Sequence, residues 1–156
     1  MSRYGYAIVA LALTLPAGVV AQRAAAAKQT AAQASQAITV YKTATCGCCT
    51  KWVDHLKAAG FNPTVHVVAD MSQSPITSRV PDSLRSCHTA TLEGYLIEGH
   101  VPADSIKQLL KDQPKIVGLA VPGMPAGSPG MESPNPEPYQ VIAFDATGKT
   151  SVFAKR

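Results

Sequence analysis

The feature that most constrains the fold is a dense group of cysteines between a strand-like and a helix-like segment. Residues 45–50 (TCGCCT) hold three of the four cysteines of the chain within four positions. Residues 37–42 before them alternate β-branched with other side chains, which predicts a strand. Residues 50–59 after them repeat apolar side chains at helical spacing, and Gly60 supplies a stop signal. We therefore expect a strand followed by a helix, with the sulfur atoms at the N-terminus of that helix.

The spacing of these cysteines argues against a purely structural disulfide. A bridge between Cys48 and Cys49 would be strained, because neighbouring Cα atoms lie about 3.8 Å apart and ordinary disulfides prefer about 4.4–6.8 Å. A bridge between Cys46 and Cys49 fits one helical turn, but it leaves Cys48 to pair with the distant Cys87. Because a helix N-terminus favours thiolate over thiol, and thiolate both attacks disulfides and binds metals, a redox role and a metal role both remain open.

The rest of the chain predicts a small α/β domain. The order β-α-β-(α)-β-β-α is typical of a thioredoxin-like domain, and a loop rich in proline, glycine and methionine and a β-hairpin extend it at the C-terminus. The further expected elements are a buried strand at 63–68, one or two helical turns within 70–86, strands at 89–92 and 95–97, a helix at 103–111, the loop at 121–131, and hairpin strands at 140–144 and 150–153.

The N-terminus has the order of a secretory signal peptide. Arg3 precedes a short apolar run, and small residues suited to cleavage end at Ala21. The apolar run is short for a membrane span, although an uncleaved anchor is the alternative. The expected organisation is a signal peptide at 1–21, a flexible linker at 22–36 and a single metal-binding domain at 37–156. Export places the thiols in an oxidising compartment, where exposed thiols tend to form disulfides.

The charge of the chain argues against nucleic acid as a partner. The formal net charge is +4, but the segment before the expected domain carries Arg3, Arg23 and Lys28 and no acidic residue. The expected domain therefore holds 11 basic and 10 acidic residues. Because no basic stripe with interleaved aromatic residues is visible, we expect no binding to nucleic acid. We also expect no membrane attachment after cleavage of the signal peptide.

Cys87 and His88 occupy an informative position just before the expected third strand. In thioredoxin-like folds this position carries a cis-proline that faces the helix-end cysteines, and here Cys-His stands in its place. We therefore expect the fourth sulfur and an imidazole to face the first three sulfurs, as a soft ligand set suited to Cu(I) or Zn²⁺. The alternatives are that Cys87 is a small buried apolar residue and that His88 is a hydrogen-bonded structural histidine.

Three further residues are candidate ligands. His100 follows the fourth expected strand, at a corner that is expected to border the same site. The alternatives for its role are a ligand, a residue that supports a ligand, and a turn residue. Met124 and Met131 lie in the proline- and glycine-rich loop, where their thioethers either bind Cu(I) or fill gaps over the core. His55 and His66 are expected to be structural or surface residues.

Three segments of the sequence resemble a known family. YKTATCGCCTKW, SCHTATLEGYLIEGHVP and GLAVPGMPAGSPGME are similar to the small exported CxCC proteins of bacterial copper-resistance systems, the CopG-type periplasmic proteins. The resemblance implies a thioredoxin-like domain, export to the periplasm, copper bound by clustered cysteines, and a part in the handling or redox conversion of copper. The family's motif residues match Cys46, Cys48, Cys49, Cys87, His88 and His100 of this chain.

Three functions follow from this reading of the sequence. The leading hypothesis is a periplasmic copper-binding protein that holds Cu(I), as a single ion or a thiolate-bridged cluster, for copper resistance. Redox conversion between Cu(I) and Cu(II), which would make it a copper oxidoreductase, is left open, and so is exchange of copper with other periplasmic copper-handling proteins. The alternatives are a thiol–disulfide oxidoreductase that uses Cys46 and Cys49, and a structural zinc site. The candidate metal ligands are Cys46, Cys48, Cys49, Cys87, His88, His100, Met124 and Met131.

Overall fold

The structure is a computed structural model that describes residues 36–156. The expected signal peptide and nearly all of the expected linker lie outside the described residues. Within that part of the chain, no helix is both long enough and apolar enough to cross a membrane. The strands are β1 (Ala37–Thr43), β2 (Asn62–Val68), β3 (His88–Leu92), β4 (Tyr95–Gly99), β5 (Gly118–Val121), β6 (Gln140–Phe144) and β7 (Thr150–Lys155).

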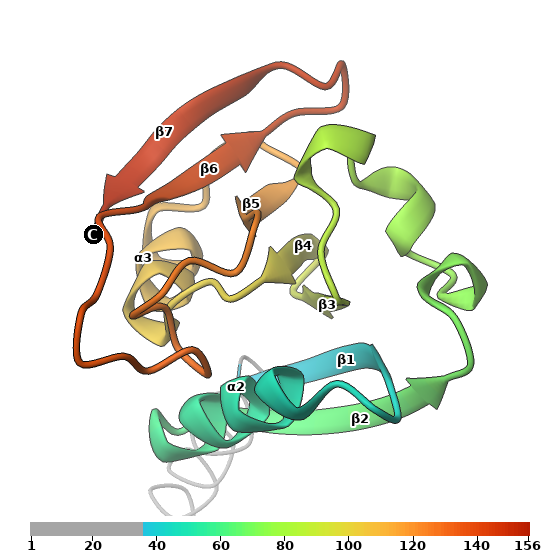
Figure 1. Ribbon diagram of the computed structural model, residues 1–156. Helices are drawn as coiled ribbons and strands as arrows, with labels where there is room; N and C mark the ends of the chain where they lie inside the picture. The colour runs from blue at the N-terminus through green and yellow to red at the C-terminus, as the bar shows by residue number, and fades with distance from the viewer. Residues whose placement is uncertain (1–35) are drawn as a thin grey trace, which may run out of the picture. The chain divides into compact units, whose positions relative to one another are not determined.

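All these strands form one mixed sheet in the order β2-β1-β3-β4-β5-β6-β7. The pairs β1–β2 and β4–β5 are parallel, and the other neighbours are antiparallel. Figure 1 shows the hairpin of β6 and β7 at one end of the sheet and β2 at the other, with α2 (Gly47–Ala58) beside β1 and β2. The strand β3 therefore lies next to the strand that leads into the cysteine motif.

Two α-helices and three short 3₁₀ turns connect the strands. In α2, the Cys46 side chain caps the N-terminus, since its sulfur accepts a hydrogen bond from the Cys49 N–H at 3.3 Å. The second helix is α3 (Ala103–Asp112), which begins after Pro102. The turns η1 (Met71–Gln73), η2 (Thr77–Arg79) and η3 (Asp82–Leu84) connect β2 to β3.

The sheet has an apolar core on each face. Successive residues of a strand point to opposite faces, so Ile97 of β4 packs with the helices, whereas its neighbour Leu96 packs with the 3₁₀ turns. The helix-side core includes Trp52, Val53 and Leu56 of α2 and Ile106 and Leu109 of α3. The turn-side core includes Val80, Leu84, Ala120 and Phe144.

The α/β class and most of the predicted elements are confirmed, and four local expectations are wrong. The segment 70–86 forms three 3₁₀ turns, where one or two helical turns were expected. The helix expected from residue 50 begins at Gly47, because Cys46 acts as its cap, so two cysteines lie inside its first turn. The strand expected to be buried, β2, is mostly exposed because it forms an edge of the sheet. The strand β5 was not expected, and the loop predicted from residue 121 overlaps its last residue. The thioredoxin-like topology stays a prediction.

Candidate metal centre

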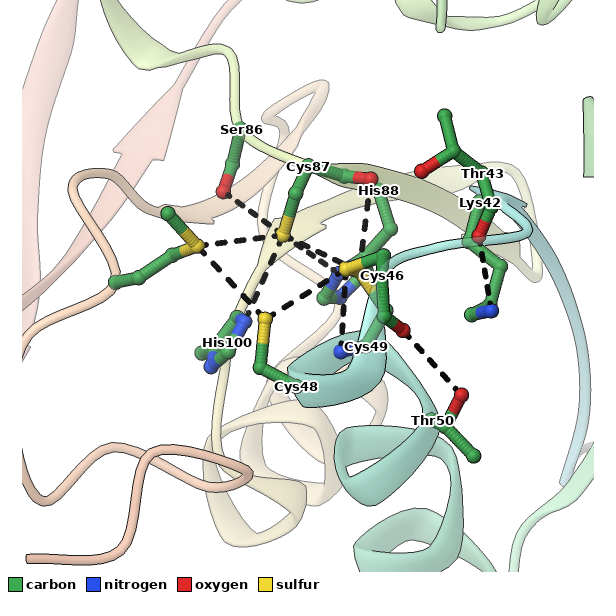
Figure 2. The surroundings of a disulfide bond; sticks show 11 residues. Lys42, Thr43, Cys46, Cys48, Cys49, Thr50, Ser86, Cys87, His88 and His100 are labelled. Carbon is green, nitrogen blue, oxygen red and sulfur yellow. Dashed lines mark hydrogen bonds between the residues drawn. A yellow bond between two sulfur atoms is a disulfide. The ribbon is translucent and has the colours of Figure 1, made fainter. Parts of the chain in front are cut away.

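Three separate segments bring their sulfur atoms together (Figure 2). The start of α2 supplies Cys46, Cys48 and Cys49, the segment before β3 supplies Cys87, and the loop after β5 supplies Met124. We call these five side chains the sulfur cluster. The ligand atoms of the four cysteines all lie within 4.8 Å of one another. The convergence expected from the position of Cys87 is therefore present.

Cys87 is the central member of the sulfur cluster. Its sulfur lies 3.2 Å from the sulfur of Cys49 and 3.5 Å from the thioether sulfur of Met124. The same sulfur lies 3.6 Å from Nδ1 of His88 and 3.7 Å from Nε2 of His100. A cation placed beside Cys87 would thus have thiol, thioether and imidazole donors around it.

Cys46 and Cys49 are joined in a disulfide, with their Cα atoms 5.3 Å apart. The helical turn makes this bridge geometrically easy, since the Cα separation lies within the ordinary range for disulfides. Cys48 and Cys87 remain free thiols. Cys48 lies 3.6 Å from the sulfur of Cys46 and 4.0 Å from that of Met124. The sequence did not decide whether this disulfide forms. In the structure it is present, and the free thiols of Cys48 and Cys87 lie next to it.

His88 and His100 form the inner side of the site. Both side chains are fully buried, and the His88 ring packs 4.3 Å from the Trp52 ring and 5.3 Å from the His100 ring. Each histidine directs one ring nitrogen at Cys87. Among the described residues, the other nitrogens, Nε2 of His88 and Nδ1 of His100, have no hydrogen-bond partner. Cys87, His88 and His100 form a second group of potential ligands that shares Cys87 with the four cysteines.

Burial sets the protonation states of the inner side. Burial, with a smaller effect from His100, lowers the pKa of His88 to about 3. Burial also lowers the pKa of His100 below its usual value. The pKa of the Cys87 thiol is raised to about 11, again chiefly by burial. At neutral pH the imidazoles are therefore neutral and able to bind a metal, whereas Cys87 has to lose a proton when it binds one.

The loop after β5 holds Met124 against the thiols. Met124 adopts φ +50°, an uncommon conformation for a non-glycine residue, and its side chain is 37% exposed. Gly130, at φ +90°, packs on the first turn of α2, since a Cβ atom there would lie 2.6 Å from the Cys48 carbonyl oxygen. None of the sulfur contacts involves Met131, whose backbone instead hydrogen bonds to Gly127 and Ser128. Its role as a ligand stays a prediction.

The histidines expected to be structural or surface residues behave as such. His55 on α2 accepts a hydrogen bond from the Ala103 N–H at 3.1 Å and so helps to fix the start of α3. His66 on β2 is exposed and stacks on Tyr41 at 5.1 Å. Neither belongs to the groups of potential metal ligands in the described part of the chain.

Glu98 is a buried acidic residue near the site that was not among the predicted functional residues. This residue of β4 is fully buried, and its carboxylate accepts hydrogen bonds from the Ser86 backbone and from the Thr89 hydroxyl. Burial raises its pKa to about 7. An acidic residue inside the otherwise apolar segment YLIEG was the signal that could have identified it.

The fold and the site together define a small α/β domain with a cysteine- and histidine-rich candidate metal centre. The chain belongs to the family of CopG copper resistance proteins. It matches the solved structure named "Copper resistance protein copG- Form 1" with 48% sequence identity and a TM-score of 0.72, over 78% of this chain and 98% of that one. It matches Form 2 with 49% identity and a TM-score of 0.71, over 77% and 97%.

A family described as "Protein of unknown function, DUF411" matches residues 84–131. This segment contains Cys87, His88, His100 and both loop methionines, whereas the cysteines of α2 lie before it. The search of curated proteins gave no match.

Proposed function

We propose that this protein binds Cu(I) at the sulfur cluster and the inner-side histidines, in the service of copper resistance. The observation that carries the proposal is the position of Cys87, whose sulfur contacts donors from α2, from the methionine loop and from both buried histidines. Because a thiolate can bridge two soft metal ions, sharing Cys87 between two ligand groups supports a thiolate-bridged cluster of copper ions. The names of the related structures agree with copper as the metal.

The chemistry of the donors favours copper over zinc. Thiolate and thioether sulfur are soft donors that select Cu(I), and a thioether such as that of Met124 binds Zn²⁺ poorly. The ring nitrogens of His88 and His100 that face the Cys87 sulfur fit a metal as well, because imidazole is a common ligand of copper. A structural zinc site of three cysteines and one histidine would leave Met124 without a role.

We further propose a thioredoxin-like domain that is exported to the periplasm. The parallel β1–α2–β2 unit, the antiparallel β3–β4 pair and the strand order β2-β1-β3-β4 support the fold. The expected signal peptide at 1–21 supports the location. In that compartment, bound copper would protect the free thiols from oxidation, and other periplasmic copper-handling proteins would supply or receive the copper.

Redox conversion of copper is a second part of the proposal. Closing the bridge between Cys46 and Cys49 releases two electrons and two protons, which is sufficient to reduce two Cu(II) ions to Cu(I). The closed bridge in this structure, 3.2 Å from the Cys87 sulfur, supports such a link between the thiol pair and the metal site. An external dithiol would then have to reopen the bridge before the next conversion.

Anaerobic titration of the reduced protein with Cu(I), followed by elemental analysis, tests copper binding. We expect tight, stoichiometric binding that cyanide or a competing thiol removes. The matched control is the same protein with the bridge between Cys46 and Cys49 closed, which should bind fewer copper ions because two sulfurs are withdrawn. Binding of zinc in preference to copper, or no tight binding of Cu(I), would refute the proposal.

A thiol–disulfide oxidoreductase is the second candidate function, and the closed bridge between Cys46 and Cys49 favours it. These residues form a C-x-x-C pair at a helix N-terminus, the usual place for a reactive thiol. The candidate leaves Cys48, Met124 and the paired histidines without a role. Insulin reduction and a measured reduction potential test it, and absence of insulin reduction by a copper-binding protein would exclude it.

A further inference from the structure

Glu98 is a buried carboxylate on the turn side of the sheet. It lies on β4 directly opposite Thr89 of β3. The side chain is fully buried and takes part in none of the salt bridges found among residues 36–156. Burial of a carboxylate without a cationic partner carries a large desolvation cost. A residue retained there is therefore expected to make contacts that an apolar side chain cannot make.

The two carboxylate oxygens of Glu98 accept hydrogen bonds from Ser86 and Thr89, the residues that flank Cys87 and His88. Oε1 accepts a hydrogen bond from the backbone N–H of Ser86 at 2.5 Å. Oε2 accepts one from the Thr89 hydroxyl at 2.6 Å, and that hydroxyl also lies 2.9 Å from the Thr77 hydroxyl. The carboxylate thus holds the segment on both sides of Cys87 and His88.

Gly99 adds a second contact to the same segment. A Cβ atom at Gly99 would lie 3.0 Å from the Ser86 hydroxyl oxygen and 3.1 Å from its Cβ, so Ser86 packs closely on the β4 backbone. The Ser86 hydroxyl in turn lies 3.8 Å from the Cys87 sulfur (Figure 2). Cys87 itself precedes β3 and lies outside the strand pairing. Its position is therefore set by the contacts of its neighbours.

We propose that Glu98 is a positioning residue that fixes the Cys87 sulfur at the centre of the metal site, through its hydrogen bond to the Ser86 N–H. The inference rests on the proposed copper binding for its functional meaning. In the described part of the chain, Glu98 makes no hydrogen bond to a candidate ligand, and it acts from the opposite face of the sheet to His88. Residues that orient a ligand in this way typically change metal affinity about 10–100-fold when they are replaced.

The test compares Glu98→Leu with two other variants of the full-length protein. Glu98→Leu removes both acceptor oxygens, whereas a glutamine could still accept from the Ser86 N–H and donate to the Thr89 hydroxyl. Thr89→Val removes the second hydrogen bond and leaves the one to Ser86. Val141→Ala, in the buried part of β6, serves as a control for lost stability alone.

Three measurements are made on each reduced variant. They are the Cu(I) affinity in competition with a chromophoric Cu(I) chelator, the ultraviolet charge-transfer band of thiolate bound to Cu(I), and the alkylation rate of Cys87 in the metal-free protein. We expect about a 10–100-fold loss of affinity in Glu98→Leu, with a shifted band and an altered alkylation rate. Thr89→Val should show smaller changes in the same direction, and Val141→Ala should match the wild type in all three.

The possible outcomes separate this inference from the proposed function. If the wild type binds Cu(I) and Glu98→Leu behaves like Val141→Ala, the positioning role is refuted and copper binding stands. If the wild type binds no Cu(I), copper binding is refuted, and the alkylation rate of Cys87 still decides whether Glu98 positions its sulfur. If Glu98→Leu does not fold, Glu98→Asp decides the question. It keeps a carboxylate but is one methylene group shorter, which draws the acceptor away from the Ser86 N–H, and an unchanged affinity and band in that variant would refute the role.

Discussion

The inner and outer sides of the candidate metal centre differ in how firmly the structure holds their side chains. His88 and His100 on the inner side are fully buried and packed against Trp52 and each other. Cys48 and Met124 on the outer side are both partly exposed, and Met124 lies in a loop. Cys87 contacts donors of both sides. The difference suggests that the inner side supplies preorganised nitrogen donors, while the outer side admits the metal and adjusts to it.

Replacing Cys87 tests whether both sides depend on one sulfur. We expect Cys87→Ser to cause the largest loss of copper, because it removes the shared member of both ligand groups. The loss of affinity should exceed the roughly 10–100-fold effect typical of residues that only support a ligand. Copper titration with elemental analysis measures it. A variant that keeps the wild-type stoichiometry would show that the two sides bind metal independently of Cys87.

Cys48→Ser should remove the thiol of the outer side alone. We expect a sharp decrease in copper stoichiometry, while Cys46 and Cys49 keep the ability to form their disulfide. Copper titration and quantification of free thiols after oxidation measure the two effects on the same sample. Normal copper binding by this variant would mean that our separation of the metal role from the redox role is wrong.

Gly130→Ala should displace the methionine loop without removing any donor. A Cβ atom at Gly130 would collide with the Cys48 carbonyl, and φ +90° adds strain of about 1–3 kcal/mol. We expect lower stability and several-fold weaker Cu(I) binding. Gly148→Ala is the matched control, since Gly148 has φ +81° but nothing within 4 Å of its Cβ position. Equal copper affinities in the two variants would exclude a role of the loop in binding.

The pH dependence of stability tests the hydrogen bond between His55 and the start of α3. Burial lowers the pKa of His55 below 6.5, although Asp104 and Glu132 oppose the shift. The neutral ring accepts the Ala103 N–H, so its stabilising effect is complete above the unfolded pKa and is lost as the pH falls through 6.5 toward the folded value.

His55→Gln keeps an acceptor that does not titrate in this range. We therefore expect the wild type to lose more free energy of unfolding than the variant between pH 8 and pH 5, by less than the net value of one hydrogen bond, about 1 kcal/mol. Denaturant unfolding of the metal-free proteins at both pH values measures the difference. Parallel losses in both proteins would show that His55 does not titrate with folding.

The sequence predicted local features well because its signals are local. The strand before the cysteines, the helix after them and the C-terminal hairpin follow from spacing and turn residues, and all are present. The approach of Cys87 to the other thiols was predicted from its place before the third strand. Those inferences needed only the order of the elements along the chain.

The features that the sequence did not predict depend on contacts between distant residues. The strand β5 has only four residues, including a glycine and an alanine of low β-propensity, and pairing with β4 and β6 on either side defines it. The exposure of β2 follows from its place at the sheet edge, which its apolar sequence does not reveal. The role of Glu98 depends on Ser86, twelve residues away.

The alternation of side chains along β3 has a practical consequence for protein engineering. His88 faces the candidate metal centre and its neighbour Thr89 faces Glu98. One face of this strand therefore supplies a candidate ligand, and the other face hydrogen bonds to the supporting carboxylate. Grafting the cysteine motif alone onto another scaffold would omit the Glu98 carboxylate that holds the segment around Cys87. A functional transplant has to carry both surfaces of β3, together with the adjoining length of β4.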